Sequence, residues 1–156
     1  MKLKILAVGQ KMPAWVTSGY QEYAKRMPRE CSLELVELAP GKRTKQSHLA
    51  KVVEDEGKRI LATLKDSDYV VALEVKGKQW STADLAAKLS SWQGVHGVIV
   101  LIIGGPDGLS EACLQRANQL WCLSALTFPH PLVRVVLAEQ LYRGWSLMNN
   151  HPYHRE

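Results

Sequence analysis

Apolar and polar positions alternate along the chain with two periods, one typical of strands and one typical of helices. Short apolar stretches predict five strands, over residues 2–8, 33–38, 69–75, 98–103 and 121–123. Apolar residues at helical spacing predict five helices, over residues 13–27, 48–64, 81–92, 110–118 and 132–150. Because strands alternate with helices, we expect an α/β sandwich built around a mainly parallel sheet.

The pattern within two of the strands predicts their places in the sheet. The stretch VIVLII, residues 98–103, is apolar at every position, as a central strand covered on both faces must be. Residues 33–38 alternate apolar and charged side chains, which indicates one face in water and a place toward a sheet edge. Gly77, just after the third predicted strand, is expected in a turn.

The last predicted helix is apolar over a wider arc than a single stripe facing a sheet requires. Its apolar residues are Leu132, Val133, Val135, Val136, Leu137, Leu141, Trp145, Leu147 and Met148. A second subunit would cover the surplus, so the pattern favours a homodimer.

The composition, with 46% hydrophobic and 22% charged residues, predicts a single globular domain over residues 1–156. The formal net charge of +5 favours a polyanionic partner such as RNA, but only modestly. No membrane association is expected, since the longest apolar run is too short to cross a bilayer and the N-terminal segment lacks a signal-peptide cleavage site. Three cysteines without CxxC spacing fit buried thiols in a cytoplasmic protein.

A glycine-rich turn, GGPDG at residues 104–108, directly follows the predicted central strand. Parallel sheets bind ligands beyond the carboxyl ends of their strands, where backbone amides face outward. The dinucleotide fingerprint GxGxxG fails because Pro106 occupies a required glycine position, and no GxxxxGK[ST] phosphate loop occurs. The turn is therefore either a ligand site of another kind or a structural turn that uses glycines for unusual dihedral angles.

A second candidate loop is LSALTFPHPLVR, residues 123–134, which is rich in small, hydroxylated and proline residues. Such a loop can press its backbone against a flat ligand, although its two prolines also suit a purely structural connection. His130 lies between these prolines at the expected N-terminus of the last helix. The local field at a helix N-terminus favours a neutral imidazole.

Polar residues interrupt the last helix and fill the tail, residues 151–156. Glu139 and Arg143 are four positions apart and share a helix face, either as a surface ion pair or as a pair at an interface or active site. The tail, HPYHRE, contains aromatic rings that can stack on unpaired bases and an arginine that can hold phosphate. Zinc binding is the alternative, but His151 and His154 lack a third ligand nearby, so no metal site is expected.

Three segments, LIIGGPDGLS, LSALTFPHPLVRVVLAEQLYR and NHPYHRE, resemble the RlmH family of SPOUT-class methyltransferases, which methylate a pseudouridine in large-subunit ribosomal RNA. The likeness includes MKLKILAVGQKMP and PGKRTK and extends over essentially the whole chain. It implies an α/β fold with a C-terminal trefoil knot, whereas the pattern alone predicts an ordinary doubly wound sheet because knots are rare. It also implies a homodimer that uses S-adenosyl-L-methionine and lacks a separate RNA-binding domain.

The resemblance implies roles for particular residues. The implied cofactor-binding residues are Leu73, Gly104, Gly105, Leu123, Ser124, Ala125, Leu126, Thr127 and Phe128. Methylation at N3 of a pseudouridine removes an imide proton, and the candidate catalytic residues are His130, Glu139, Arg143, Tyr153 and His154. Among these, Arg143 is expected to hold phosphate or polarise the base, and the other four are equivalent candidates for the general base. The candidate RNA-binding residues are Lys42, Arg43, Lys45 and Arg155.

Two other functions stay open from the residues alone. A non-catalytic ribosome-binding protein would need the basic loop and the tail but not the glycine turn. A metal-dependent hydrolase would use the tail histidines and would lose activity to chelators. For the methyltransferase, we expect the tail to reach the cofactor pocket of a twin subunit. We also expect the assembled ribosome to be the substrate, because each subunit has little basic surface.

Overall fold

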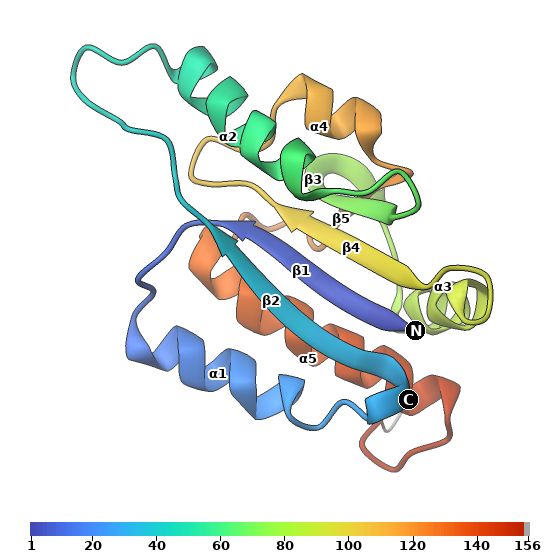
Figure 1. Ribbon diagram of the computed structural model, residues 1–156. Coiled ribbons are helices and arrows are strands. Elements are labelled where there is room, and N and C mark those ends of the chain that lie inside the picture. Colours follow the sequence, from blue (N-terminus) through green and yellow to red (C-terminus); the bar gives the residue numbers. More distant parts are fainter. Residues whose placement is uncertain (155–156) are drawn as a thin grey trace.

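A five-stranded sheet in the order β2-β1-β4-β3-β5 forms the centre of the computed structural model, which describes residues 1–154 (Figure 1). The strands are β1 (Lys2–Val8), β2 (Ser32–Leu38), β3 (Tyr69–Gln79), β4 (Val98–Ile103) and β5 (Gln119–Cys122). All four neighbouring pairs are parallel. The predictions of a parallel sheet, of an inner strand at residues 98–103 and of an edge strand at residues 33–38 are confirmed.

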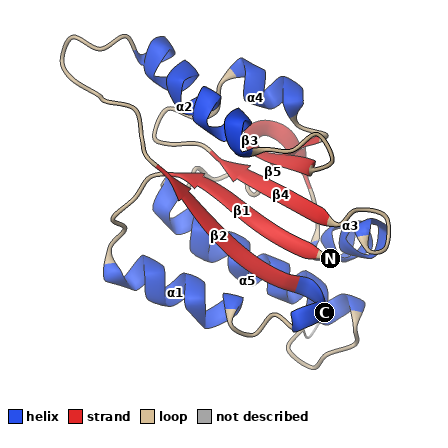
Figure 2. Ribbon diagram, viewed as in Figure 1, coloured by secondary structure: helices blue, strands red, loops and turns tan. Residues whose placement is uncertain are grey.

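Helices cover both faces of the sheet (Figure 2). One face carries α1 (Ala14–Ala24), α3 (Thr82–Trp92) and α5 (His130–Met148), and the other carries α2 (Leu49–Thr63) and α4 (Glu111–Arg116). A short 3₁₀ turn, η1 (Arg29–Cys31), leads into β2. Each helix predicted from the sequence is present, with ends that differ from the prediction by a few residues.

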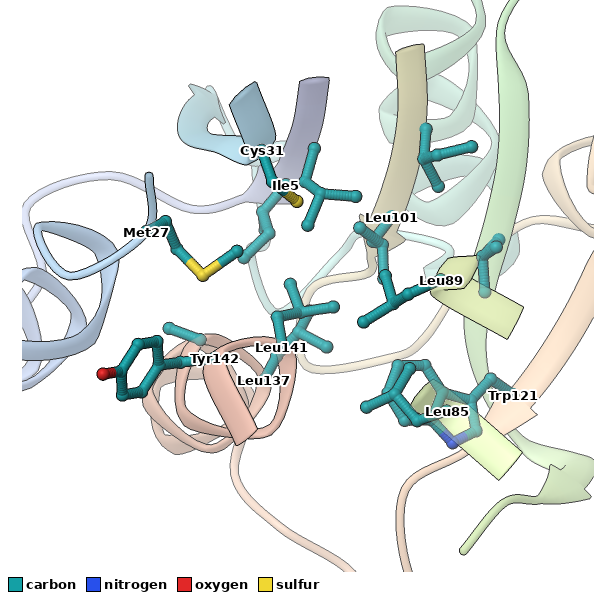
Figure 3. Close-up of a cluster of buried hydrophobic side chains, with 14 of the residues drawn as sticks. Ile5, Met27, Cys31, Leu85, Leu89, Leu101, Trp121, Leu137, Leu141 and Tyr142 are labelled. Carbon is teal, nitrogen blue, oxygen red and sulfur yellow. The ribbon is translucent and has the colours of Figure 1, made fainter. Parts of the chain in front are cut away.

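The core has two parts because successive side chains of a strand point to opposite faces of the sheet. Ile5 of β1 packs on the side of α1, α3 and α5, whereas its neighbour Leu6 packs on the side of α2 and α4. On the first side, Leu101 of β4 lies with Leu85 of α3 and Leu137 of α5 in one buried cluster (Figure 3). Each of these side chains stabilises the fold by roughly 1.5–3 kcal/mol through burial.

The end of β3 and the start of α3 confirm one prediction and correct another. Ser81 and Asp84 form the expected capping box, in which each side chain accepts a hydrogen bond from the other residue's backbone N–H. Gly77 is not in a turn, because β3 continues through it to Gln79. A Cβ at Gly77 would lie 2.6 Å from the carbonyl carbon of Leu120 in β5. The glycine therefore permits a close approach of two strands where their register is irregular.

Because all neighbouring strands are parallel, their carboxyl ends lie at the same end of the sheet, and the turns after β4 and β5 both leave from that end. Helix α5 begins at this end of the strands and runs toward their amino ends, and Met1 and Tyr153 both pack against the core on the face that α5 covers (Figure 1). Functional groups at the two ends of α5 are therefore far apart within one chain.

Candidate functional site

The turn after β4 approaches itself so closely that only glycine fits at its start. A Cβ at Gly104 would lie 2.6 Å from the backbone carbonyl carbon of Gly108 and 2.9 Å from the backbone nitrogen of Leu109. The backbone N–H of Gly108 donates to the carbonyl oxygen of Gly105 over 3.1 Å, and Gly108 has a φ of +83°. Pro106 and Asp107 form the middle of this tight turn, as their residue types favour.

The turn after β5 is held by short local hydrogen bonds. The thiol of Cys122 donates to the carbonyl oxygen of Ser124, and the Ser124 hydroxyl accepts from the backbone N–H of Leu126 over 2.9 Å. Leu126 itself is 72% exposed, which is unusual for a large apolar side chain. The turn then reaches Pro129, and α5 begins at His130.

These two turns and the middle of β3 enclose a cavity of about 450 Å³. Of the predicted cofactor residues, all but one line the cavity: Leu73, Gly104, Gly105, Leu123, Ser124, Leu126, Thr127 and Phe128. The exception is Ala125, which is exposed beside it. The volume falls within the range of roughly 300–1,000 Å³ that is usual for small-molecule sites.

The lining of this cavity, called the cofactor pocket below, suits a flat ligand with a cationic group. Apolar walls come from side chains such as Ile103, Leu109 and Leu114, and the carboxylate residue Glu74 lies at the same cavity. Gly104 and Gly105 also line the cavity, and the absence of a Cβ at Gly104 lets the turn fold back onto the backbone of Gly108. Sequence reasoning missed these wall residues because nothing in their spacing marks them as different from other core positions.

His130 lines the cofactor pocket, and it is the only one of the five candidate catalytic residues to do so within residues 1–154. Burial lowers the pKa of its imidazole below the ordinary value of 6.5, and the cations of Arg134 and Arg43 lower that pKa further. The prediction that His130 lies at the N-terminus of the last helix is confirmed. A lowered pKa favours the neutral imidazole, which is the form that can accept a proton.

Arg134, one helical turn after His130, is a buried residue that sequence reasoning missed. Its side chain is 1% exposed, and its guanidinium donates to the carbonyl oxygen of Gly9 over 2.9 Å and to the carboxylate of Glu37. It thereby connects α5 to the ends of β1 and β2. A lone arginine within the apolar run PLVRVVL was the available signal, because a buried charge needs a specific partner.

Glu139 and Arg143 in the C-terminal half of α5 form a second polar cluster with Tyr153 of the segment that follows the helix. The guanidinium of Arg143 donates to Glu139 Oε1 over 2.6 and 2.9 Å, and the Tyr153 hydroxyl donates to the same oxygen over 2.9 Å. Burial raises the pKa of the Tyr153 phenol to about 12, with help from the Glu139 hydrogen bond and charge. In this arrangement the phenol is a hydrogen-bond donor and a poor base.

This second cluster is remote from the cofactor pocket of its own chain. Arg143 follows His130 by thirteen positions, which corresponds to about 20 Å along a helix. His154 follows Tyr153 directly and is partly buried at the same end of the molecule. The predicted RNA-binding residue Arg155 lies outside the described residues.

The basic loop divides its three cations between two environments. Lys42 and Lys45 are exposed. Arg43 instead turns inward, and its guanidinium pairs with Glu56 at 2.8 Å and with Asp107 at 2.9 Å. The loop thus lies beside the glycine turn, a proximity that the sequence alone did not indicate.

A second cavity, of about 480 Å³, lies between α1 and β2. Its lining includes Tyr20, Glu34, Glu37 and Arg134, and it includes none of the residues predicted to bind a cofactor or RNA. Glu34 is paired with Lys2, and Glu37 is paired with Arg134, so these charges already have partners.

Within residues 1–154, no group of three or more potential metal-ligating side chains comes together. Over the same residues, no helix is both long enough and apolar enough to cross a membrane. The three cysteines, Cys31, Cys113 and Cys122, are buried free thiols, as predicted.

The fold and the turn-lined pocket define a class of methyltransferase, and comparison with known families agrees. Residues 1–154 match the family described as "Predicted SPOUT methyltransferase". The chain belongs to the SPOUT methyltransferase family. The trefoil knot expected for the C-terminal part of the chain follows from this family membership.

One similar protein has a name that is more specific than the family description. The protein named ribosomal RNA large subunit methyltransferase H from Methylococcus capsulatus (strain Bath) is 56% identical over 155 residues, which cover 99% of this chain and 100% of that protein. The solved structure of a probable methylase family protein from Haemophilus influenzae Rd KW20 is similar with a TM-score of 0.61 and 11% identity, over 99% of this chain and 70% of that chain. The second likeness concerns the fold alone.

Proposed function

We propose that this protein transfers a methyl group from S-adenosyl-L-methionine to N3 of a pseudouridine in large-subunit ribosomal RNA, on the assembled ribosome in the cytoplasm. The observation that carries the proposal is the cofactor pocket, where three segments distant in sequence meet at the carboxyl edge of a parallel sheet. Family membership supports methyl transfer, and the full-length relative named as a ribosomal RNA large subunit methyltransferase supports this class of RNA as the substrate.

The residues of the pocket fit this cofactor. The glycine turn and the turn of residues 123–128 would hold the adenosine part between them, against the apolar walls of Leu73 and Phe128. The Glu74 carboxylate would attract a positively charged group of the cofactor, either the sulfonium or the α-ammonium. When bound, the cofactor supplies a methyl group on an electrophilic sulfonium.

We assign His130 as the general base. An attack by N3 requires that the imide proton leave, and the neutral imidazole of His130 lies at the pocket to accept it onto a ring nitrogen. General-base assistance of this kind contributes about 10²–10⁴-fold to a rate. Tyr153, with a pKa near 12, is better suited to donate a hydrogen bond than to accept this proton.

We infer that the working enzyme is a homodimer in which the tail of one copy completes the pocket of the other. Arg143 lies about 20 Å from His130 along α5, and it shares its cluster with Glu139 and Tyr153, so we infer that this cluster and His130 of one chain do not act on the same base. A two-fold arrangement in which α5 meets its twin can bring both groups to one base, and it would also cover apolar surface of that helix. Arg143 and Arg155 would then hold phosphate or polarise the base.

The RNA would approach across the exposed lysines of the basic loop, Lys42 and Lys45. A formal charge of only +5 gives each chain weak general affinity for RNA, so recognition depends on the shape of the ribosome.

The direct test mixes the purified protein with labelled S-adenosyl-L-methionine and ribosomes from cells that lack the protein. Mass spectrometry should locate one methyl group on N3 of a pseudouridine in the large-subunit RNA. Label found on another base or on ribosomal protein, or no transfer at all, would overturn the proposal. A short isolated hairpin serves as the comparison substrate and should be methylated far more slowly.

A subunit-mixing experiment tests the shared site. His130→Gln and a chain that ends at residue 150 should each be inactive, because one lacks the base and the other lacks the tail. If the tail acts in the partner's pocket, unfolding and refolding the two together should restore about a quarter of the wild-type activity, since half of the dimers are mixed and each contains one intact site. If the tail acts within its own chain, mixing restores nothing.

A further inference from the structure

An ion network at the edge of the cofactor pocket gives Arg43 a different role from RNA binding. Arg43 Nη1 and Nη2 donate to the two carboxylate oxygens of Glu56 over 2.8 and 3.1 Å, and Nε donates to Asp107 over 2.9 Å. A weaker bond joins Nη1 to the carbonyl oxygen of Gly41. These four hydrogen bonds occupy most donors of the guanidinium, so little capacity is left for a phosphate.

Glu56 is the buried anchor of this network. Its side chain is only 2% exposed, and one carboxylate oxygen also accepts the backbone N–H of Gly41 over 2.9 Å. A buried carboxylate is stable only when it is paired and hydrogen-bonded, and here the loop of Arg43 supplies both kinds of partner. Helix α2 thereby fixes the course of the loop that precedes it.

The same network touches the glycine turn at two points. Asp107, in the middle of the turn, pairs with Arg43. A Cβ at Gly105 would lie 3.4 Å from Glu56 Oε1 and 3.5 Å from Arg43 Nη2, so both charged groups pack directly against the turn backbone. The charge of Arg43 also reaches His130, whose pKa it helps to lower.

We propose that Arg43 and Glu56 are positioning residues for the glycine turn: they hold Asp107 and Gly105 in the shape that binds the cofactor and attach that turn to the basic loop. The inference rests on the proposed function of the pocket. It reassigns Arg43 from the set of RNA-binding residues, in which Lys42 and Lys45 remain. If Lys42 and Lys45 contact phosphate, the RNA binds the same loop through which Arg43 holds the glycine turn.

The test uses Arg43→Lys, Asp107→Asn and the double variant, with Arg59→Lys as the matched control. Arg59 lies on α2 near Glu56 and donates to Ala39 of the same loop, but none of its bonds reaches the turn. Asp107 is 31% exposed, so Asp107→Asn should fold even if a change at Arg43 does not. The measurements are calorimetric titration with S-adenosyl-L-methionine, the melting temperature, and hydrogen exchange of residues 104–109 without cofactor.

Each single variant should raise the Kd for the cofactor about tenfold, and the double variant should be little worse than Arg43→Lys alone, because both single variants remove the Arg43–Asp107 interaction. Amide exchange in residues 104–109 should become faster, while the melting temperature of Asp107→Asn and all values for Arg59→Lys stay close to wild type. Unchanged exchange in the turn, or effects that add up as for independent sites, would overturn the inference. If the wild-type protein fails to bind the cofactor, the proposed function fails, and the exchange rates still decide whether the network positions the turn.

Discussion

Replacing Gly104 with alanine is expected to damage the cofactor pocket while leaving the rest of the fold in place. The added Cβ would lie 2.6 Å from the carbonyl carbon and 2.7 Å from the carbonyl oxygen of Gly108. Both are backbone atoms, so the turn must open to relieve the overlap. Opening also strains the 3.1 Å hydrogen bond from the Gly108 N–H to Gly105.

The magnitude follows from these two effects. Overpacking of this kind costs about 1–3 kcal/mol, and losing one hydrogen bond costs about 0.5–1.5 kcal/mol. If the cofactor binds the closed turn, its Kd should rise roughly 10- to 100-fold, since about 1.4 kcal/mol corresponds to a factor of ten. The free energy of unfolding should fall by about 1–3 kcal/mol for the same reason.

Calorimetric titration and urea unfolding measure the two quantities, and Gly97→Ala is the matched control. Gly97 directly precedes β4 as Gly104 directly follows it, but a Cβ there meets no atom within 4 Å. Gly97→Ala should bind the cofactor within a factor of about two of wild type. A Gly104→Ala protein that binds as tightly as wild type would refute the reasoning, because the turn would then not need its present shape.

Three further perturbations have defined outcomes. His130→Gln should lower kcat by about 10²–10⁴-fold with an unchanged cofactor Kd in calorimetry, and a loss of less than about tenfold would exclude His130 as the base. Folding lowers the pKa of His130, so the unfolded chain takes up a proton first as the pH falls below 6.5. The free energy of unfolding of the wild type should therefore decline more steeply below this pH than that of His130→Gln. Parallel pH curves from urea unfolding would refute this linkage. Arg134→Met should reduce the free energy of unfolding by about 2 kcal/mol or more. The reason is that the carbonyl oxygen of Gly9 loses its buried donor and the carboxylate of Glu37 loses its partner. An unchanged free energy of unfolding would mean that neither bond stabilises the fold.

The sequence pattern was sufficient for the helices, the strands and the parallel sheet because its strongest signals are local, whereas the knot was implied only by the family resemblance. The apolar stretch at residues 98–103 placed an inner strand, and Ser81 with Asp84 marked the start of a helix through a capping box. Gly77 was misjudged because a glycine that permits a close approach of two strands looks the same, in sequence, as a glycine in a turn. That distinction depends on Leu120, which lies far away along the chain.

The pocket was predictable in part for a related reason. The position of Gly104 after a buried strand suggested a ligand site, and the family resemblance implied that the loop before His130 joins it, which agrees with their common cavity. The network of Arg43, Glu56 and Asp107 was not predictable, because its members are widely separated in sequence and each is an ordinary surface residue type. The separation of His130 from Glu139 and Arg143 was also not predicted, because it depends on the length and direction of α5 in the folded protein.

A crystal structure of the protein with S-adenosyl-L-methionine would decide whether the pocket at the carboxyl edge of the sheet is the methyl donor site. The donor should lie between the glycine turn and residues 123–128, with its methyl group facing His130. A donor bound in the cavity between α1 and β2, or a pocket at the carboxyl edge that stays empty at saturating donor, would show that the proposed chemistry is assigned to the wrong residues.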